Sequence, residues 1–383
     1  MKGIPIQSKL PNLQVSIFAV MTRLAEETKA INLSQGFPDF NCNPRLIDLV
    51  FHYIKTGRNQ YAPMPGILPL REAISRKIAG LYGALYDPQS EITITAGATE
   101  ALYAAITSVV QSGDEVIIFE PFYDAYPPVV KYSGGVPRFI RLNPPDFRIP
   151  WQKVKNIISK KTKLIIINSP HNPTGAILEK EDLEKLAEIV DGTSIFIVSD
   201  EVYEHIVFDN KKHLSLAMHP ALQRRTFVIS SFGKTYHTTG WKVGYCAAPE
   251  LLSHEFRKIH QFITFAVNTP VQWAYADILN KKELYLQLPK FYQKKRDLFR
   301  KAMLASNFDL LPCRGTYFQV ADYYKISRES DLEFVKKLAT KHGVAAIPLS
   351  PFYDEEPEQQ LIRFCFAKQD ATLIKAGERL CQI

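Results

Sequence analysis

A lysine in an unusual setting is the first candidate for chemistry in this sequence. Lys234 lies in the segment SSFGKTY at residues 230–236, and Lys242 and Gly244 follow it closely. A lysine amine forms Schiff bases with carbonyl compounds, and its pKa falls when it is desolvated near another cation. An isolated lysine is more often simply solvated, so the segment becomes informative only together with others.

Two further segments place polar side chains directly after apolar runs. Asp200 ends one run, and a carboxylate there suits a protonated ring nitrogen, although aspartate also favours the N-cap of a helix. Asn172 lies in NSPHNPTG at residues 168–175. Its amide could donate to a ligand oxygen, or this turn rich in asparagine, proline and glycine could simply reverse the chain.

A fourth segment, TAGATE at residues 95–100, lies between an expected strand and an expected helix. Glycine lets a backbone approach a ligand closely, and a helix N-terminus offers free N–H groups to an anion. Such a turn is common when taken alone. Together, the four segments supply a phosphate cradle, a partner for a ring nitrogen, donors to a phenolic oxygen and a Schiff-base amine. Those are the groups that a pyridoxal 5'-phosphate (PLP) site requires.

The elements that must position these residues alternate between short β-branched runs and helical patterns. Strands are expected at residues 91–95, 115–119, 163–168, 194–199, 227–231 and 243–247, with helices between them, for example at 99–111 and 180–191. The alternation predicts an α/β fold with a mostly parallel central sheet and helices on both faces. Ligands gather at the carboxyl ends of such strands, which is where the four segments lie.

The C-terminal part of the chain follows a different pattern. A long amphipathic helix is expected at residues 287–306, strands at 316–320 and 361–366, and helices at 331–342 and 372–382. This pattern predicts a smaller α+β domain. We therefore expect a large PLP-binding domain at residues 41–280 and a small C-terminal domain at 281–383. Residues 1–40 form an N-terminal segment that contributes to the small domain and to the active site.

Composition narrows the class of protein. The 383 residues are 46% hydrophobic and 22% charged, which is ordinary for a soluble globular protein. Residues 1–20 lack the pattern of a signal peptide, and no apolar run is long enough to span a bilayer. The five cysteines are scattered and form no CxxC pair, so we expect no disulfide framework, no metal site and a cytoplasmic location. The net charge of +8 is spread along the chain and does not favour nucleic-acid binding.

The sequence resembles the class I/II aminotransferases of PLP fold type I. The resemblance runs from NLSQGFPDF at residues 32–40 to LIRF at 361–364, and it is most specific over residues 230–244. Within the family, the chain is similar to the branch that holds bacterial methionine-preferring aminotransferases and kynurenine aminotransferase–glutamine transaminase K.

The resemblance implies catalytic roles for Lys234, Asp200 and Tyr203. Lys234 would hold PLP as a Schiff base and later move the substrate proton. Asp200 would form an ion pair with the pyridine nitrogen. Tyr203 and Asn172 would hydrogen-bond the phenolic oxygen of the cofactor, and Tyr123 would stack on its ring.

The resemblance also implies a phosphate site and a homodimer. The phosphate would be held by Gly97, Ala98, Thr99, Ser231 and Lys242. Many family members carry arginine where Lys242 stands, and lysine keeps the charge but loses the bidentate fork. Tyr61 would reach the phosphate of a neighbouring subunit, which requires a homodimer with shared active sites.

For the substrate, the resemblance implies that Arg363 pairs with the α-carboxylate, aided by Gly36 and Asn172. Arginine suits a planar carboxylate through two parallel hydrogen bonds. Phe18, Tyr61 and Phe122 are expected pocket walls, although an aromatic residue near the N-terminus is by itself more often part of a core. We identify no second arginine for an ω-carboxylate.

These roles predict an enzyme of amino acid metabolism that moves the amino group of methionine or an aromatic amino acid to a 2-oxo acid by a ping-pong mechanism. The alternative is a PLP-dependent cysteine-S-conjugate or C–S β-lyase, because that reaction shares the Cα carbanion. A PLP-binding regulator without catalysis is a third possibility, but the N-terminal segment is too short for the DNA-binding domain that such proteins usually carry.

Overall fold

The computed structural model describes residues 7–11, 15–355, 357 and 359–383. A seven-stranded sheet lies at its centre, in the order β2-β8-β7-β6-β5-β3-β4. The strands are β2 (Ile92–Thr95), β3 (Glu115–Glu120), β4 (Val136–Arg141), β5 (Thr162–Asn168), β6 (Phe196–Asp200), β7 (Thr226–Ser231) and β8 (Gly244–Ala247). Six of the seven strands run in the same direction, and β8 alone runs opposite to them.

Burial on both faces explains why the sheet strands are almost continuously apolar. In β5, Leu164 and Ile166 belong to one apolar cluster, while Ile165 and Ile167 belong to another. This alternation is the period of two that a strand imposes. The sheet is therefore the shared wall of two hydrophobic cores.

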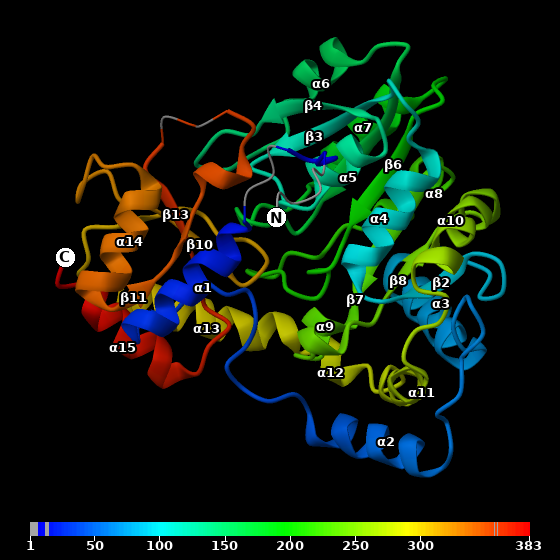
Figure 1. Cartoon of the computed structure of the whole chain (residues 1–383), viewed down its shortest axis with the longest axis horizontal. Helices are drawn as coiled ribbons and strands as arrows, with labels where there is room; N and C mark the ends of the chain where they lie inside the picture. Colours follow the sequence, from blue (N-terminus) through cyan, green and yellow to red (C-terminus); the bar gives the residue numbers. More distant parts are fainter. Residues whose placement is uncertain (1–6, 12–14, 356, 358) are drawn as a thin grey trace, which may run out of the picture.

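Helices cover both faces of this sheet (Figure 1). On one side lie α4 (Ala98–Val109), α5 (Tyr126–Tyr132) and α10 (Glu250–Ile263), which share a core with the strands. On the other side lie α3 (Leu68–Tyr82), α6 (Trp151–Ile157) and α7 (Lys180–Val190). The helix α2 (Pro44–Lys55) packs against α11 (Thr269–Ile278) at the bottom of the view.

The C-terminal part forms a second, antiparallel sheet in the order β12-β13-β10-β9. Its strands are β9 (Asp309–Leu310), β10 (Phe318–Asp322), β12 (Ile347–Pro348) and β13 (Leu361–Cys365), and its helices are α13 (Leu288–Ala302), α14 (Asp331–His342) and α15 (Asp370–Leu380). The N-terminal part of the chain joins it. Strand β1 (Ile31–Asn32) pairs with β11 (Val344–Ala345), and α1 (Ile17–Thr28) packs against α14 (Figure 1).

The expected strands of the central sheet are all confirmed, with ends that differ by one or two residues. Strand β4 was not expected, because its outward-facing residues are partly exposed and Pro137 interrupts its pattern. The domain boundaries near residues 40 and 280 stay a prediction.

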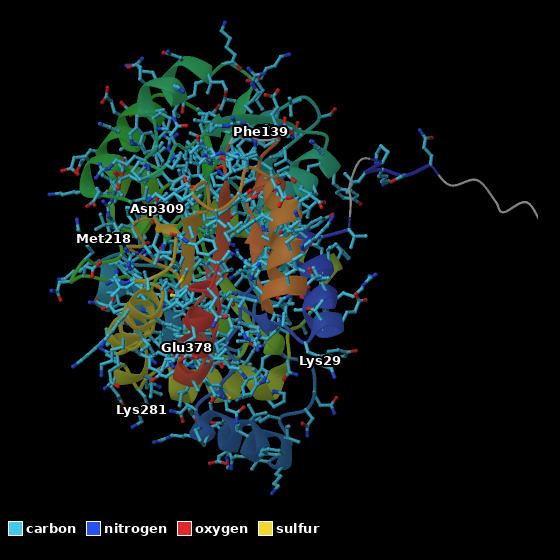
Figure 2. The ribbon with its side chains drawn as sticks, turned by 90° about the vertical axis from the view of Figure 1, so that its left-hand side faces the viewer. Lys29, Phe139, Met218, Lys281, Asp309 and Glu378 are labelled. Carbon is cyan, nitrogen blue, oxygen red and sulfur yellow. The ribbon has the colours of Figure 1, made fainter. Side chains whose placement is uncertain are left out.

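Side chains fill the space between the ribbons in Figure 2, and the charged Lys29, Lys281, Asp309 and Glu378 that it labels are exposed. All five cysteines are free. No helix in the described part of the chain combines the length and the apolar character that a membrane span needs.

Candidate active site

A cavity of about 340 Å³ lies at the carboxyl edge of the central sheet. Because β8 runs antiparallel, its first residues meet the last residues of its neighbours, and this brings Lys242 to the same edge. Most of the predicted site residues line this cavity, namely Phe18, Gly36, Ala98, Thr99, Tyr123, Asn172, Asp200, Tyr203, Ser231, Lys234, Lys242 and Arg363. The topology thus assembles residues that lie far apart in the sequence.

Lys234 lies on the short helix α9 (Phe232–Thr235), directly after β7. The Ser231 hydroxyl caps this helix by accepting a hydrogen bond from the Gly233 N–H at 3.2 Å. Burial lowers the pKa of Lys234 to about 8, and the positive charges of Arg363 and Lys242 act in the same direction. More of the neutral, nucleophilic amine is therefore present near neutral pH than for an ordinary lysine.

Asp200, the last residue of β6, is 3% exposed. Its Oδ2 accepts a hydrogen bond from the Tyr126 hydroxyl at 2.6 Å, and its Oδ1 accepts one from the Val202 N–H at 3.3 Å. Burial raises the pKa of Asp200 to about 6, against the opposing effect of these hydrogen bonds. No helix begins at Asp200 in the described chain, so the alternative role as a helix N-cap is wrong.

The predicted phosphate cradle lies where α4 begins, beside Lys242. Ala98 and Thr99 form the first turn of this helix, whose N–H groups and dipole favour an anion. Gly97 has a φ of +80°, and a Cβ added there would lie 3.3 Å from Nζ of Lys242. Gly97 therefore keeps space for the Lys242 side chain beside the helix terminus, although it is not itself a wall of the cavity.

Arg363, on β13 of the smaller sheet, is 1% exposed. Its Nη1 donates to Oδ1 of Asn172 at 2.8 Å, and its Nη2 donates to the carbonyl of Ser34 at 3.2 Å. The guanidinium carbon lies 3.8 Å from the ring centroid of Phe318 and 5.2 Å from that of Phe18. Within the described residues, the buried Nε has no hydrogen-bond partner, so the arginine keeps a donor free for a ligand oxygen.

The remaining predicted aromatic residues divide between the cavity and other places. Tyr203 and Tyr123 line the cavity. Phe122 does not, because its ring packs in the core at 5.4 Å from the Phe139 ring, so its expected place in the pocket wall is wrong. Tyr61 is 83% exposed and packs edge-on against Phe265, outside the cavity of its own chain.

Several residues of the site could not be recognised in the sequence. Tyr126 contacts Asp200, and Tyr317 accepts a hydrogen bond from Nζ of Lys234 at 2.9 Å. Phe318 and Phe37 line the cavity. Tyr317 and Phe318 lie within the strand expected at residues 316–320 of the smaller domain, where aromatic residues are typical of a core. Phe37 lies in the segment of residues 32–40 that carried the family resemblance.

A buried ionic network surrounds Glu204, which lies in the segment that follows β6. Oε1 of Glu204 lies 2.6 Å from Nζ of Lys77 and accepts a hydrogen bond from the Ser230 hydroxyl at 2.6 Å, while Oε2 accepts one from Tyr82 at 2.6 Å. Burial alone would raise the pKa of Glu204, but the charge of Lys77 holds it below its ordinary value. The network ties α3 to the segments that carry Tyr203 and Ser231.

The residues present fit PLP. Lys242 and the α4 N-terminus suit a phosphate, and Oδ1 of Asp200 has only a long hydrogen bond and can still accept one from a ring N–H. Lys234 and the aromatic ring of Tyr123 line the same cavity.

Comparison with known proteins agrees with this chemistry. The family described as aminotransferase class I and II matches residues 28–380. The methionine aminotransferase of Escherichia coli is 51% identical over 98% of each chain, and the kynurenine–oxoglutarate transaminase of Dictyostelium discoideum is 34% identical over 96% of this chain and 94% of its own. A crystal structure from Escherichia coli, of a protein with an identified methionine aminotransferase function, covers 100% of both chains with a TM-score of 0.98 and 51% identity. The mostly parallel sheet, the cavity at its carboxyl edge and this similarity along the whole chain lead to one conclusion: the protein belongs to the class I and II aminotransferases, which are PLP-dependent enzymes of fold type I.

Proposed function

We propose that this aminotransferase moves the amino group of methionine or an aromatic amino acid to a 2-oxo acid in two half-reactions. The observation that carries the proposal is the meeting of Lys234, Asp200 and Arg363 in one cavity. They supply an amine, an anion for a ring nitrogen and a cation for a substrate carboxylate. The relatives reported above are named for amino transfer, which favours transfer over the β-lyase alternative.

Asp200, Lys234 and Arg363 have separate roles in the proposed reaction. PLP, when bound, supplies a ring that accepts the electron pair released at the substrate Cα. Asp200 would hold a proton on the ring nitrogen by charge. Lys234 would hold the cofactor through its amine, and this amine, when free, would take the Cα proton as general base. Arg363 fixes the carboxylate, which orients the Cα–H bond toward Lys234.

The cofactor itself would be held from three sides. Tyr203 and Asn172 are the proposed donors to its phenolic oxygen, and Tyr123 is the proposed stacking partner of its ring. The first turn of α4 with Ser231 and Lys242 would bind the phosphate, since both the helix terminus and the lysine favour an anion.

The walls of the cavity support a neutral substrate side chain. Phe18, Phe37, Leu102 and Phe318 contribute apolar surface. Among the described residues of the lining, Arg363 is the single arginine, and it is already assigned to the α-carboxylate. An ω-carboxylate would therefore meet apolar surface without a compensating charge, which is costly. Methionine and aromatic side chains match the pocket better than aspartate.

We further infer a homodimer that functions in the cytoplasm. The exposed Tyr61 supports the dimer, because its hydroxyl is free to reach the phosphate site of a second copy. The free cysteines are compatible with a reducing compartment.

The visible absorption spectrum of the protein with PLP tests the proposal. Addition of L-methionine should bleach the band of the lysine-bound cofactor, and a 2-oxo acid should restore it. A band that ignores methionine but responds to kynurenine or phenylalanine would change the proposed donor. Release of pyruvate and ammonia from a cysteine conjugate without any oxo acid would favour the lyase instead.

Arg363→Ala should lower kcat/KM for methionine by about 100-fold or more, because a buried bidentate partner of the carboxylate is lost. Arg363→Lys keeps the charge but not the fork, and it should recover only part of the loss. The measurement is steady-state kinetics together with PLP affinity. Arg138→Ala, on the exposed edge strand β4, is the matched control. Loss of PLP binding in Arg363→Ala, rather than of amino acid binding, would contradict the role.

A further inference from the structure

We propose that the Tyr317 hydroxyl and the Gly36 carbonyl hold the amine of Lys234 in one position whenever this amine is not bonded to the cofactor. Tyr317 would then be a positioning residue for amino transfer. The part of the inference that concerns turnover rests on the proposed function, whereas the part that concerns the free lysine does not.

Three hydrogen bonds form a closed triangle around the amine. Nζ of Lys234 donates to Oη of Tyr317 at 2.9 Å and to the Gly36 carbonyl at 3.2 Å. The Tyr317 hydroxyl donates its own proton to the same carbonyl. Because its proton is committed to Gly36, the tyrosine oxygen is left to accept from the lysine.

This triangle fixes the direction of the lysine lone pair. A neutral amine has two N–H bonds and one lone pair, and two acceptors engage both N–H bonds. The lone pair of Lys234 then points away from both acceptors and is free to accept a proton from a substrate. Without Tyr317, the amine could rotate about its last carbon bond and present an N–H instead.

The two acceptors are themselves rigid. Tyr317 is 0% exposed, and its ring lies edge-on to Tyr203 at 5.2 Å and to Phe318 at 4.9 Å. A Cβ added at Gly36 would lie 2.9 Å from the Phe318 ring, so a larger residue there would displace the carbonyl. Rigid acceptors cost little entropy when they orient the flexible lysine.

Other charged and titratable groups also act on the amine, and they stay in place when the hydroxyl is removed. They are Asp200 on β6, Lys242 before β8, Arg363 and Cys365 on β13, and Tyr203 after β6. A change in the Lys234 titration caused by Tyr317→Phe therefore reports the missing hydroxyl, because that variant keeps the ring and its packing.

The test measures the reactivity of Lys234 in the cofactor-free, full-length protein. Trace labelling with acetic anhydride at a series of pH values, read by mass spectrometry of the Lys234 peptide, gives the pH of half-maximal labelling. Removal of an acceptor destabilises the ammonium form, so Tyr317→Phe should move this pH down by roughly half a pH unit or more. With PLP bound, kcat should fall about fivefold, the equivalent of one neutral hydrogen bond of about 1 kcal/mol, and the isotope effect from Cα-deuterated methionine should rise.

Tyr292→Phe is the matched control. Tyr292 is also 0% exposed, its ring lies 5.6 Å from that of Tyr317, and its hydroxyl has no hydrogen-bond partner within the described residues. Its labelling curve should overlay that of the wild type. The inference is overturned if the Tyr317→Phe curve also overlays the wild type, or if both variants shift equally, which would indicate loosened packing. If Tyr317→Phe does not fold, 3,5-difluorotyrosine at position 317 weakens the same acceptor and should shift the curve in the same direction.

The two hypotheses fail in different ways. If the wild-type protein with PLP transfers no amino group from any donor, the proposed function fails, while the labelling experiment still decides how Lys234 is held. If amino transfer is normal in Tyr317→Phe and its labelling is unchanged, only the positioning role fails.

Discussion

Lys234→Ala should lower the rate of amino transfer by about 10⁴-fold or more, because in the proposed mechanism one side chain supplies both the covalent attachment and the general base. Among the described residues that line the cavity, the other amine is that of Lys242, which lies beside Gly97 at the proposed phosphate site. It is therefore not available to replace Lys234. The measurement is the single-turnover rate with L-methionine, which is obtained from the change in cofactor absorbance.

Controls separate this loss of chemistry from a loss of fold. Lys211→Ala removes a lysine whose partner is the surface residue Glu179, and it should behave as the wild type. A small exogenous amine should restore part of the rate in Lys234→Ala, since it can enter the space that the side chain leaves. Turnover above one thousandth of the wild-type rate without added amine would refute the assignment of Lys234.

Asp200→Ala should lower kcat by about 10²-fold to 10³-fold, because no anion then holds the proton on the ring nitrogen and the ring accepts electrons less readily. Asp200→Asn keeps the shape but not the charge, so it should be nearly as slow. The measurement is kcat together with the absorption spectrum of the bound cofactor. Asp146→Asn, whose side chain pairs with Arg314 near the surface, is the control. A variant at Asp200 with normal kcat would exclude the proposed ion pair.

The raised pKa of Asp200 leads to two further expectations, one for the pH dependence of PLP binding and one for the stability of the fold. Burial raises this pKa from 3.8 to about 6, so the carboxyl group takes up a proton as the pH falls through about 6 and can no longer pair with a cation. PLP affinity should therefore fall below this pH in the wild type, and Asp200→Asn should not show this fall.

For folding, the raised pKa of Asp200 means that the charged form is disfavoured in the folded state. Above about pH 6, Asp200→Asn should therefore stabilise the cofactor-free protein, by at most about 3 kcal/mol in thermal unfolding.

The strand ends that carry the site could be predicted because parallel strands buried on both faces leave a clear apolar signal. Asp200 and Asn168 stand where the apolar runs of β6 and β5 stop, and Lys234 follows β7 in the same way. Since parallel strands end at the same edge, the proximity of these side chains could be predicted from the sequence alone. The residues that fit the family pattern then completed the cavity, including Arg363 from the other sheet.

The partners of these residues could not be predicted, because they depend on contacts between distant parts of the chain. The Tyr126 hydroxyl meets Asp200 across 74 positions, and Tyr317 meets Lys234 across 83. A buried tyrosine has the same sequence pattern whether its hydroxyl serves the site or has no partner, as that of Tyr292 in the described chain. The pairing of β1 with β11 was equally hidden, since each strand has only two residues.

The buried network of Glu204 and Lys77 has a consequence for how substrate range could diverge in evolution. It ties α3 to the segments that carry Tyr203 and Ser231, so substitutions within the network cost stability. Phe18 and Phe37 also line the cavity, but they lie in the N-terminal part of the chain and outside this network. Substitutions at these two positions can change the apolar wall of the cavity without disturbing the Glu204 network, and relatives of this chain are named for donors as different as methionine and kynurenine. We therefore expect substrate range to diverge more readily at Phe18 and Phe37 than at Tyr203 and Ser231.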